Sequence, residues 1–95
     1  MIRINCFISV SEEKKNKVLE SAKRLTMASL KQDGCIAYDV FESATRPEVL
    51  MICETWRDKK ALDAHSISQV FHDEVSIITN NAEMKLETFE FKKGE

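Results

Sequence analysis

Hydrophobic and polar residues alternate along the first ten positions of the chain. Aliphatic residues and one cysteine occupy the even positions from Ile2 to Val10, whereas the odd positions hold more polar side chains, among them Asn5. A period of two is typical of a β-strand that turns one face toward a core. The pattern therefore predicts a strand over residues 2–10.

The hydrophobic spacing then changes to that of a helix. Between Val18 and Leu30 apolar residues recur every three to four positions, which indicates an amphipathic helix. Ser11 can cap its N-terminus, and the two glutamates that follow suit a first helical turn. Because glycine often follows a helix C-terminus, we expect this helix to end near Asp33 and Gly34.

Two apolar stretches, 35–42 and 49–56, have the composition of strands and are separated by the short segment SATRPE. Pro47 in that segment suits a turn and is disfavoured inside a central strand. The short connection predicts that the two strands pair as an antiparallel hairpin.

The remaining residues predict two helical segments and a last strand. Asp58 can cap a short helix, and Ser66 with Gln69 has the spacing of a capping box that would start the next segment. A pair of asparagines can end that segment, and residues 83–91 alternate as a final strand.

The order β-α-β-β-α-β predicts a single ferredoxin-like α+β sandwich over residues 1–95, with a four-stranded antiparallel sheet and helices on one face. Strands 35–42 and 49–56 are apolar on both faces; strict alternation places Ile36 on one face and Cys35 on the other. Because the helices of one chain cover only one face, we expect a homodimer packed sheet to sheet.

The composition is that of a globular domain and narrows the classes of partner. Apolar residues make up 43% of the chain, charged residues 32%, and the net charge is −2. No basic stripe suggests nucleic-acid binding, and no apolar run approaches the ~20 residues that a membrane span needs. The three cysteines form no CxxC pair and lie in apolar segments, so we expect reduced core thiols in a cytoplasmic protein.

Residues 54–65, ETWRDKKALDAH, carry the most suggestive polar side chains. Glu54 and Trp56 are two apart in a predicted strand and leave the same face. A carboxylate on an apolar wall needs a partner, or its pKa rises and it can carry a proton. His65 ends the next helix, where the dipole favours the imidazolium and the ordinary pKa suits proton transfer. Glu54 and His65 are therefore candidate catalytic residues; a salt-bridged Glu54 and a structural His65 are the alternatives.

Further side chains could complete a pocket. Asn5 is unusual in a strand and suggests either an exposed sheet or a polar group aimed at a ligand. Tyr38 is the only tyrosine, and His72 would share the helical face of His65 only on an unbroken helix. Because the chain has no glycine-rich phosphate loop, nucleophile elbow or metal-ligand spacing, we expect neither a cofactor nor a metal.

The chain resembles the antibiotic biosynthesis monooxygenase family, including its quinol-monooxygenase-like members. The resemblance rests on the opening strand MIRINCFISV, on GCIAYDVFES, and above all on ETWRDKKALDAH. It implies a dimeric α/β barrel and cofactor-free oxygenation of a small phenolic or quinol substrate between the sheet and the helices. In this resemblance His65 is the base or hydrogen-bond donor, and Glu54 orients a neighbour. The substrate-binding side chains we expect are Asn5, Tyr38, Trp56, Phe71 and His72.

Two other functions stay open at this level. The same fold and motif also resemble an isomerase of small phosphorylated signalling sugars, which would shuttle protons through the histidine and need cations at the pocket mouth. Arg57, Lys59 and Lys60 are the nearby basic cluster, and a solvated helix edge explains them equally well. The remaining alternative is a dimeric small-molecule-binding or stress-response module without turnover.

Overall fold

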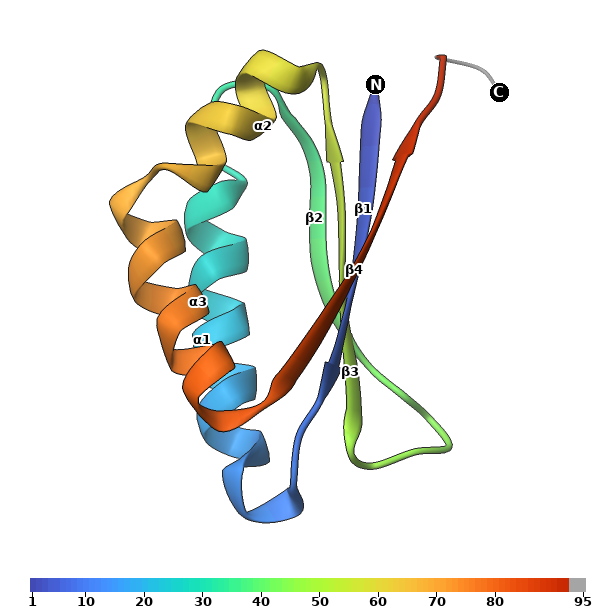
Figure 1. Ribbon diagram of the computed structural model, residues 1–95, viewed down its shortest axis with the longest axis vertical. Helices are drawn as coiled ribbons and strands as arrows, with labels where there is room; N and C mark the ends of the chain where they lie inside the picture. The colour runs from blue at the N-terminus through green and yellow to red at the C-terminus, as the bar shows by residue number, and fades with distance from the viewer. Residues whose placement is uncertain (93–95) are drawn as a thin grey trace.

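Helices cover one face of an antiparallel sheet in the computed structural model, which describes residues 1–92 (Figure 1). The predicted βαββαβ order and ferredoxin-like fold are confirmed, with two successive helices in the second crossover. The predicted domain range extends to residue 95, and its last three residues lie outside the described part. In chain order the elements are β1 (Ile2–Ser9), α1 (Glu12–Ser29), β2 (Cys35–Glu42), β3 (Val49–Trp56), α2 (Lys59–Ser66), α3 (Gln69–Asn81) and β4 (Glu83–Glu90).

The central strands of the sheet are β3 and β1, in the order β2-β3-β1-β4. Glu54 of β3 is opposite Ile4 of β1 on one side and Tyr38 of β2 on the other. Since both edges of β3 are paired, its backbone is fixed by two ladders of hydrogen bonds. Glu54 and Trp56 are thereby held two residues apart on the helix-covered face.

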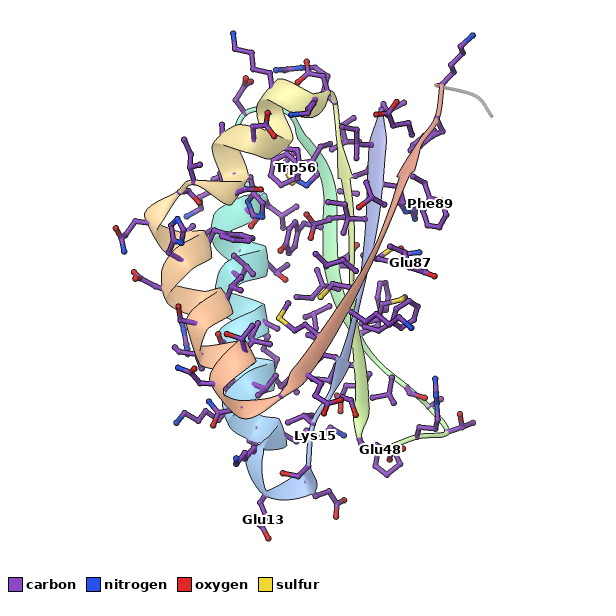
Figure 2. The ribbon with its side chains drawn as sticks, in the orientation of Figure 1. Glu13, Lys15, Glu48, Trp56, Glu87 and Phe89 are labelled. Atoms are coloured by element: carbon purple, nitrogen blue, oxygen red, sulfur yellow. The ribbon has the colours of Figure 1, made fainter. Side chains whose placement is uncertain are left out.

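The core fills the layer between the sheet and the helices. Every even position of β1 from Ile2 to Ile8 is buried, as the alternation predicted. Trp56 points into this layer (Figure 2) and is fully buried. The buried hydrophobic cluster consists of Cys6, Ile8, Val10, Val18, Ala22, Leu25, Tyr38, Leu50, Ile52, Trp56, Ala61 and Ile78.

The first helix ends earlier than the sequence suggested. α1 ends at Ser29 with Leu30 as its C-cap, so the expected end near Gly34 is wrong. Gly34 does adopt a positive φ of 81°, but in the turn that leads into β2. Its carbonyl accepts the N–H of Arg57 at 2.8 Å, and a side chain at this position would overlap the Cβ of Ala61. This glycine therefore allows the turn to approach α2 closely.

The predicted N-cap is confirmed for α2 and wrong for α3. Asp58 caps α2 as predicted, since its carboxylate accepts the N–H of Ala61 at 2.9 Å. The start of α3 is capped by Ser68, whose hydroxyl accepts the N–H of Phe71 at 3.3 Å. Ser66, the predicted cap, lies in the last turn of α2 and donates to a carbonyl one turn earlier.

A β-bulge in β2 changes which residues face the helices. Cys35 pairs with Trp56, and the next pair is Ala37 with Thr55, so Ile36 is the extra residue. Strict alternation is therefore wrong at this end of the strand. Ile36 is 53% exposed, and Cys35 packs against the core.

The other face of the sheet carries no helix within residues 1–92 (Figure 1). By register, Phe7, Met51 and Phe41 lie on this open face, and Figure 2 shows Phe89 on the same side. Phe41 and Phe89 are each 50% exposed. Within the described residues, no helix combines the length and apolar character needed to cross a membrane.

Candidate functional site

Glu54 is a buried carboxylate in the middle of the sheet. It is 6% exposed and accepts a hydrogen bond from the indole Nε1 of Trp56 at 2.8 Å. No lysine or arginine of residues 1–92 forms an ion pair with it. Burial raises the pKa of Glu54, and hydrogen bonds from Trp56 and Tyr38 lower the pKa only in part. The carboxyl group is therefore able to hold a proton nearer to neutral pH than an exposed glutamate.

His65 reaches the same buried region from the last turn of α2. Its side chain is 2% exposed, and its Nδ1 lies 2.7 Å from Oε1 of Gln32. Its Nε2 lies 4.0 Å from Oε1 of Glu54 and has no hydrogen-bond partner in the described chain. Burial lowers the pKa of His65 to about 4. The expectation that the helix dipole favours imidazolium here is wrong, because desolvation outweighs it and the ring is neutral at pH 7.

Aromatic rings enclose the imidazole. The centroid of His65 lies 4.5 Å from that of Trp56, 5.7 Å from that of Tyr38 and 5.2 Å from that of Phe71. The Tyr38 and Phe71 contacts are edge-on, the common arrangement of packed aromatic pairs. We call Glu54, Trp56, His65, Tyr38 and Gln32 the polar cluster.

Tyr38 connects the polar cluster to the rest of the core. Burial raises the pKa of its phenol well above the ordinary value, and the neighbouring carboxylate of Glu54 raises the pKa further. The phenol is therefore a neutral hydrogen-bonding group at physiological pH. Its ring also forms part of the wall of a cavity.

An apolar cavity of about 240 Å³ lies between the sheet and the helices. All four strands contribute to its wall, as do α1 and α3, and carbon atoms dominate the lining. Tyr38 and Phe71 are the lining residues that also contact His65, so these two rings connect the cavity with the imidazole. The remaining lining residues are Cys6, Leu25, Ile52, Val75, Thr79, Met84 and Leu86.

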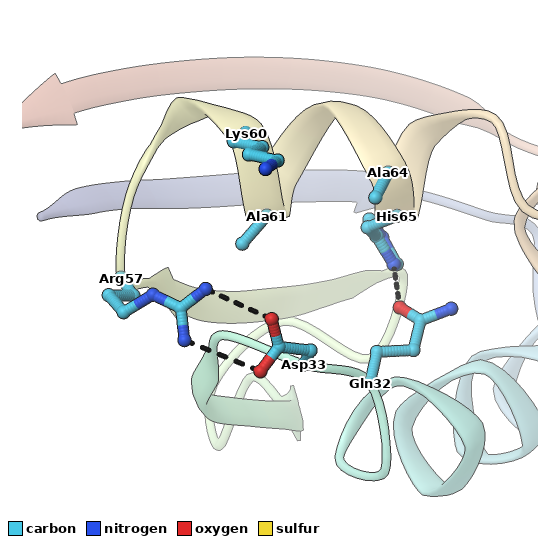
Figure 3. Close-up of a pocket in the computed structure, with 7 residues that line it drawn as sticks. All are labelled: Gln32, Asp33, Arg57, Lys60, Ala61, Ala64 and His65. Carbon is cyan, nitrogen blue, oxygen red and sulfur yellow. Dashed lines mark hydrogen bonds and ion pairs between the residues drawn. The ribbon is translucent and has the colours of Figure 1, made fainter.

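A second hollow, which we call the outer groove, has His65 in its lining (Figure 3). Its volume is about 320 Å³, and it runs between α2 and the turn before β2. Arg57 in this groove is held by two hydrogen bonds to Asp33, of 3.0 and 3.3 Å, and by an ion pair with Asp58. Lys60 is the other basic residue of the lining. The buried imidazole thus lies between an apolar cavity and a polar groove.

Two of the expected site residues lie away from the polar cluster. Asn5 belongs to the open face of the sheet, where its Oδ1 accepts a hydrogen bond from the thiol of Cys53 at 3.3 Å. The expectation that Asn5 shares a pocket with His65 is therefore wrong within one chain, because strand alternation points it to the other face. His72 is exposed on α3, and the break between α2 and α3 removes it from the face of His65.

The family model described as "Antibiotic biosynthesis monooxygenase" matches residues 1–75, which include β3, α2 and the buried Glu54 and His65. The chain belongs to the antibiotic biosynthesis monooxygenase family.

One of three proteins similar to this family member has a monooxygenase name. A solved structure from Bacteroides thetaiotaomicron, described as a conserved protein of unknown function and "possible oxidoreductase", is 54% identical, with a TM-score of 0.94 over 95% of this chain and 96% of that one. A Bacillus subtilis protein with the name "Putative monooxygenase YcnE" is 30% identical over 70% of each chain. The Synechocystis protein sll1783, described as uncharacterized, is 29% identical over 83% of this chain. The chain spans 56% of the length of that Synechocystis relative.

Sequence reasoning missed the parts of this family member's candidate site that come from distant segments. Gln32 follows α1 and contacts His65 across 33 positions of sequence, and nothing in its surroundings marks it as a partner. The apolar lining residues look like ordinary core positions, because a cavity depends on side-chain packing rather than on pattern. No group of three His, Cys, Asp or Glu side chains within residues 1–92 could hold a metal ion.

Proposed function

We propose that the protein is a cofactor-independent monooxygenase that acts on a small phenolic or quinol substrate. The observation that carries the proposal is the buried Glu54–His65 pair, whose imidazole contacts two rings, Tyr38 and Phe71, that also line the apolar cavity. A proton-accepting pair beside a carbon-lined space is the combination that activation of a phenol needs.

The volume and lining of the cavity favour an uncharged substrate that has one aromatic ring or two fused rings. Its volume of about 240 Å³ is small for a ligand site, and its wall offers almost no polar surface. A charged substrate would lose its hydration without gaining a partner there. A phenol instead buries its ring and presents one hydroxyl group to the polar cluster.

In the proposed reaction the phenol first loses its proton toward the polar cluster. The phenolate gives one electron to dioxygen, and the resulting superoxide joins the ring radical at carbon to form a peroxide. Loss of water from the peroxide leaves a quinone, so that phenol and O₂ give quinone and H₂O. The substrate supplies all four electrons, and one oxygen atom of O₂ enters the product.

His65 and Glu54 of the polar cluster have different roles in this reaction. His65 accepts the substrate proton through Nε2, which has no partner in the described chain. Glu54 takes up the proton or stabilises the imidazolium from 4.0 Å. Burial disfavours the charged form of both groups, raising the pKa of Glu54 and lowering that of His65. A proton that enters the pair therefore rests on Glu54.

The aromatic residues have supporting roles in this proposal. Phe71 and Tyr38 hold the substrate ring, since both line the apolar cavity. Trp56 is fully buried behind them and orients Glu54 through its indole N–H. It acts as a positioning residue rather than as a wall against the ring.

Oxygen uptake tests the proposed function directly. Protein dialysed against a chelator should consume O₂ with at least one member of a panel of hydroquinones and naphthols. His65→Ala should lower the rate by about 100-fold, the usual scale of a general base or acid. Asp63→Ala, on the exposed side of the same helix, is the matched control and should leave the rate unchanged. An unaltered rate in His65→Ala would contradict the role of the histidine.

The outer groove is where the alternative function, an isomerase of phosphorylated sugars, would need to bind a phosphate. Its lining brings Arg57 and Lys60 near His65, as a phosphate would require. However, Arg57 is already neutralised by Asp33 and Asp58, which leaves one lysine to attract an anion. The oxygenase proposal is therefore better supported, and a binding module without turnover would show neither oxygen uptake nor isomerisation.

The proposal includes a homodimer formed through the open face of the sheet. Phe41 and Phe89 on this face are half exposed, and by register Phe41, Met51 and Phe7 form one row across three strands. The apolar side chains favour a second sheet as the cover of this face, which also carries Arg3, Lys85 and Glu87 by register. All three cysteines are free thiols, which supports the expectation of a reducing, cytoplasmic environment.

A further inference from the structure

Gln32 is the one side chain of the described residues that hydrogen-bonds to the imidazole of His65. It lies in the turn between α1 and β2 and is half buried. Its Oε1 is 2.7 Å from Nδ1, and Figure 3 shows the amide and the ring facing each other across the groove floor. At 2.7 Å this contact has the length of a short hydrogen bond, and the imidazole side of it is buried.

In a neutral imidazole, a hydrogen bond at one ring nitrogen decides whether the other nitrogen carries the hydrogen. One ring nitrogen carries the hydrogen and the other has a lone pair, and the partner of one nitrogen sets the state of both. An amide oxygen at Nδ1 can only accept, so the hydrogen lies on Nδ1. Nε2 then offers its lone pair on the side of Glu54, 4.0 Å from the carboxylate oxygen.

No other neighbour can set the tautomer in this way. Trp56, Tyr38 and Phe71 present ring faces or edges to the imidazole, and Glu54 is beyond hydrogen-bond distance from Nε2. The charged residues of the outer groove are Asp33, Arg57 and Lys60, of which the first two pair with each other. The hydrogen bond to Gln32 is thus what distinguishes Nδ1 from Nε2 in the surroundings of His65.

The turn holds Gln32 firmly on both sides. The N–H of Gln32 donates to the carbonyl of Ser29 at 3.0 Å, and its carbonyl accepts from Cys35 at 3.2 Å. Asp33 next to it is clamped by Arg57, and Gly34 lies directly against α2. Backbone and neighbours therefore fix the amide relative to the helix that carries the histidine.

We propose that Gln32 is a positioning residue that holds the proton of His65 on Nδ1 and keeps Nε2 open as the proton acceptor beside Glu54. The effect of Gln32 on turnover rests on the proposed function. The tautomer of His65 is a property of the free protein and does not depend on a substrate. Gln32→Met removes the amide at similar length, and Gln32→Glu keeps an oxygen acceptor at the same place.

Nitrogen-15 NMR reads the tautomer without any substrate. The chain has two histidines, so the ring nitrogens of His65 are assigned by comparison with His72→Gln. At neutral pH wild-type His65 should give a hydrogen-bearing Nδ1 and a bare Nε2. Gln32→Met should shift the ratio of the two tautomers about fivefold or more toward the Nε2–H form, the effect of one lost hydrogen bond. Gln32→Glu should keep the wild-type tautomer.

Asp33→Asn is the matched control, because it changes the charge of the same groove without touching the ring; the tautomer should stay as in wild type. A wild-type His65 with its hydrogen on Nε2, or a Gln32→Met protein with an unchanged ratio, would overturn the proposal. Where a substrate is turned over, Gln32→Met should lower kcat by about tenfold with little change in KM. Absence of turnover in wild type would count against the oxygenase proposal and leave the NMR result standing.

Discussion

Burial acts on the two titratable side chains of the polar cluster so that both favour their neutral forms. The pKa of Glu54 is raised and that of His65 is lowered to about 4. Neither group has a permanent charge nearby to offset the desolvation. Such an arrangement reduces stability, and proteins retain it mostly where proton transfer is needed. The pH dependence of unfolding should therefore carry the signature of these residues.

His65 should make the fold less stable in mild acid. Its pKa is about 4 in the folded protein and about 6.5 when unfolded, so between these values the unfolded chain binds the extra proton. The free energy of unfolding should fall by up to about 3 kcal/mol as the pH drops from about 6.5 to about 4. Glu54 works in the opposite sense, since its raised folded pKa favours the folded state in acid and this contribution fades as the pH rises.

Urea unfolding over a pH series separates the two effects. His65→Gln should lose the decline in acid, while His72→Gln should retain it because His65 is intact. The difference between wild type and His65→Gln isolates the contribution of this ring from that of Glu54. An identical pH profile in both proteins would mean that the imidazole is charged or accessible in the folded state.

At the scale of secondary-structure elements, the joint between the α1–β2 turn and α2 positions the site. Gly34 has a φ of 81° and lies against Ala61, which brings Gln32 within reach of His65. Any side chain at Gly34 would meet both an unfavourable backbone conformation and the helix. The strength of this joint can be measured with a double-mutant cycle.

Gly34→Ala should destabilise the fold by about 2 kcal/mol or more, from the left-handed backbone and from the overlap with Ala61. Ala61→Gly alone should cost about 1 kcal/mol as a helix glycine. In the Ala61→Gly background the Gly34→Ala change should cost less, because the overlap is removed and only the backbone strain remains. Chemical denaturation of the four proteins gives the coupling, and purely additive effects would contradict the close packing.

The elements themselves could be predicted because their signals are local. The alternation in β1 and the cap at Asp58 depend on neighbouring residues, and both were correct. The end of α1 was misplaced because Gly34 serves a tertiary contact with Ala61, which no local pattern reveals. Likewise the bulge at Ile36 shifts the pairing of β2 with β3 by one residue, which strict alternation cannot predict.

The sheet has one face covered by helices and one that carries no helix within residues 1–92 (Figure 1), and Phe7, Phe41, Met51 and Phe89 lie on the latter. We expect wild type to be a dimer by light scattering at micromolar concentration. Met51→Lys, near the centre of the open face, should yield a folded monomer because a lysine there loses its hydration on association. Ile67→Lys is the control: Ile67 is 77% exposed in the helical layer, and its replacement should leave the dimer intact. A monomeric wild type would refute the predicted dimer.

Sequence reasoning reached the fold and the pair Glu54–His65, since strand parity and helix length fix where these side chains leave the backbone. It did not separate the apolar cavity from the polar cluster, nor place Asn5 on the opposite face. Both depend on which face of the sheet the helices cover, which an asparagine in an alternating strand does not reveal. Locating the whole site therefore needed the tertiary structure, although its two buried titratable residues could be found without it.

Isotope incorporation tests the central claim most directly. Purified, chelator-treated protein is incubated under ¹⁸O₂ with a phenol from the panel that supports oxygen uptake, and the product is analysed by mass spectrometry. The account predicts one heavy oxygen atom in each quinone formed, with the second recovered as water. Unlabelled product, or labelled product formed equally well by His65→Ala, would contradict it.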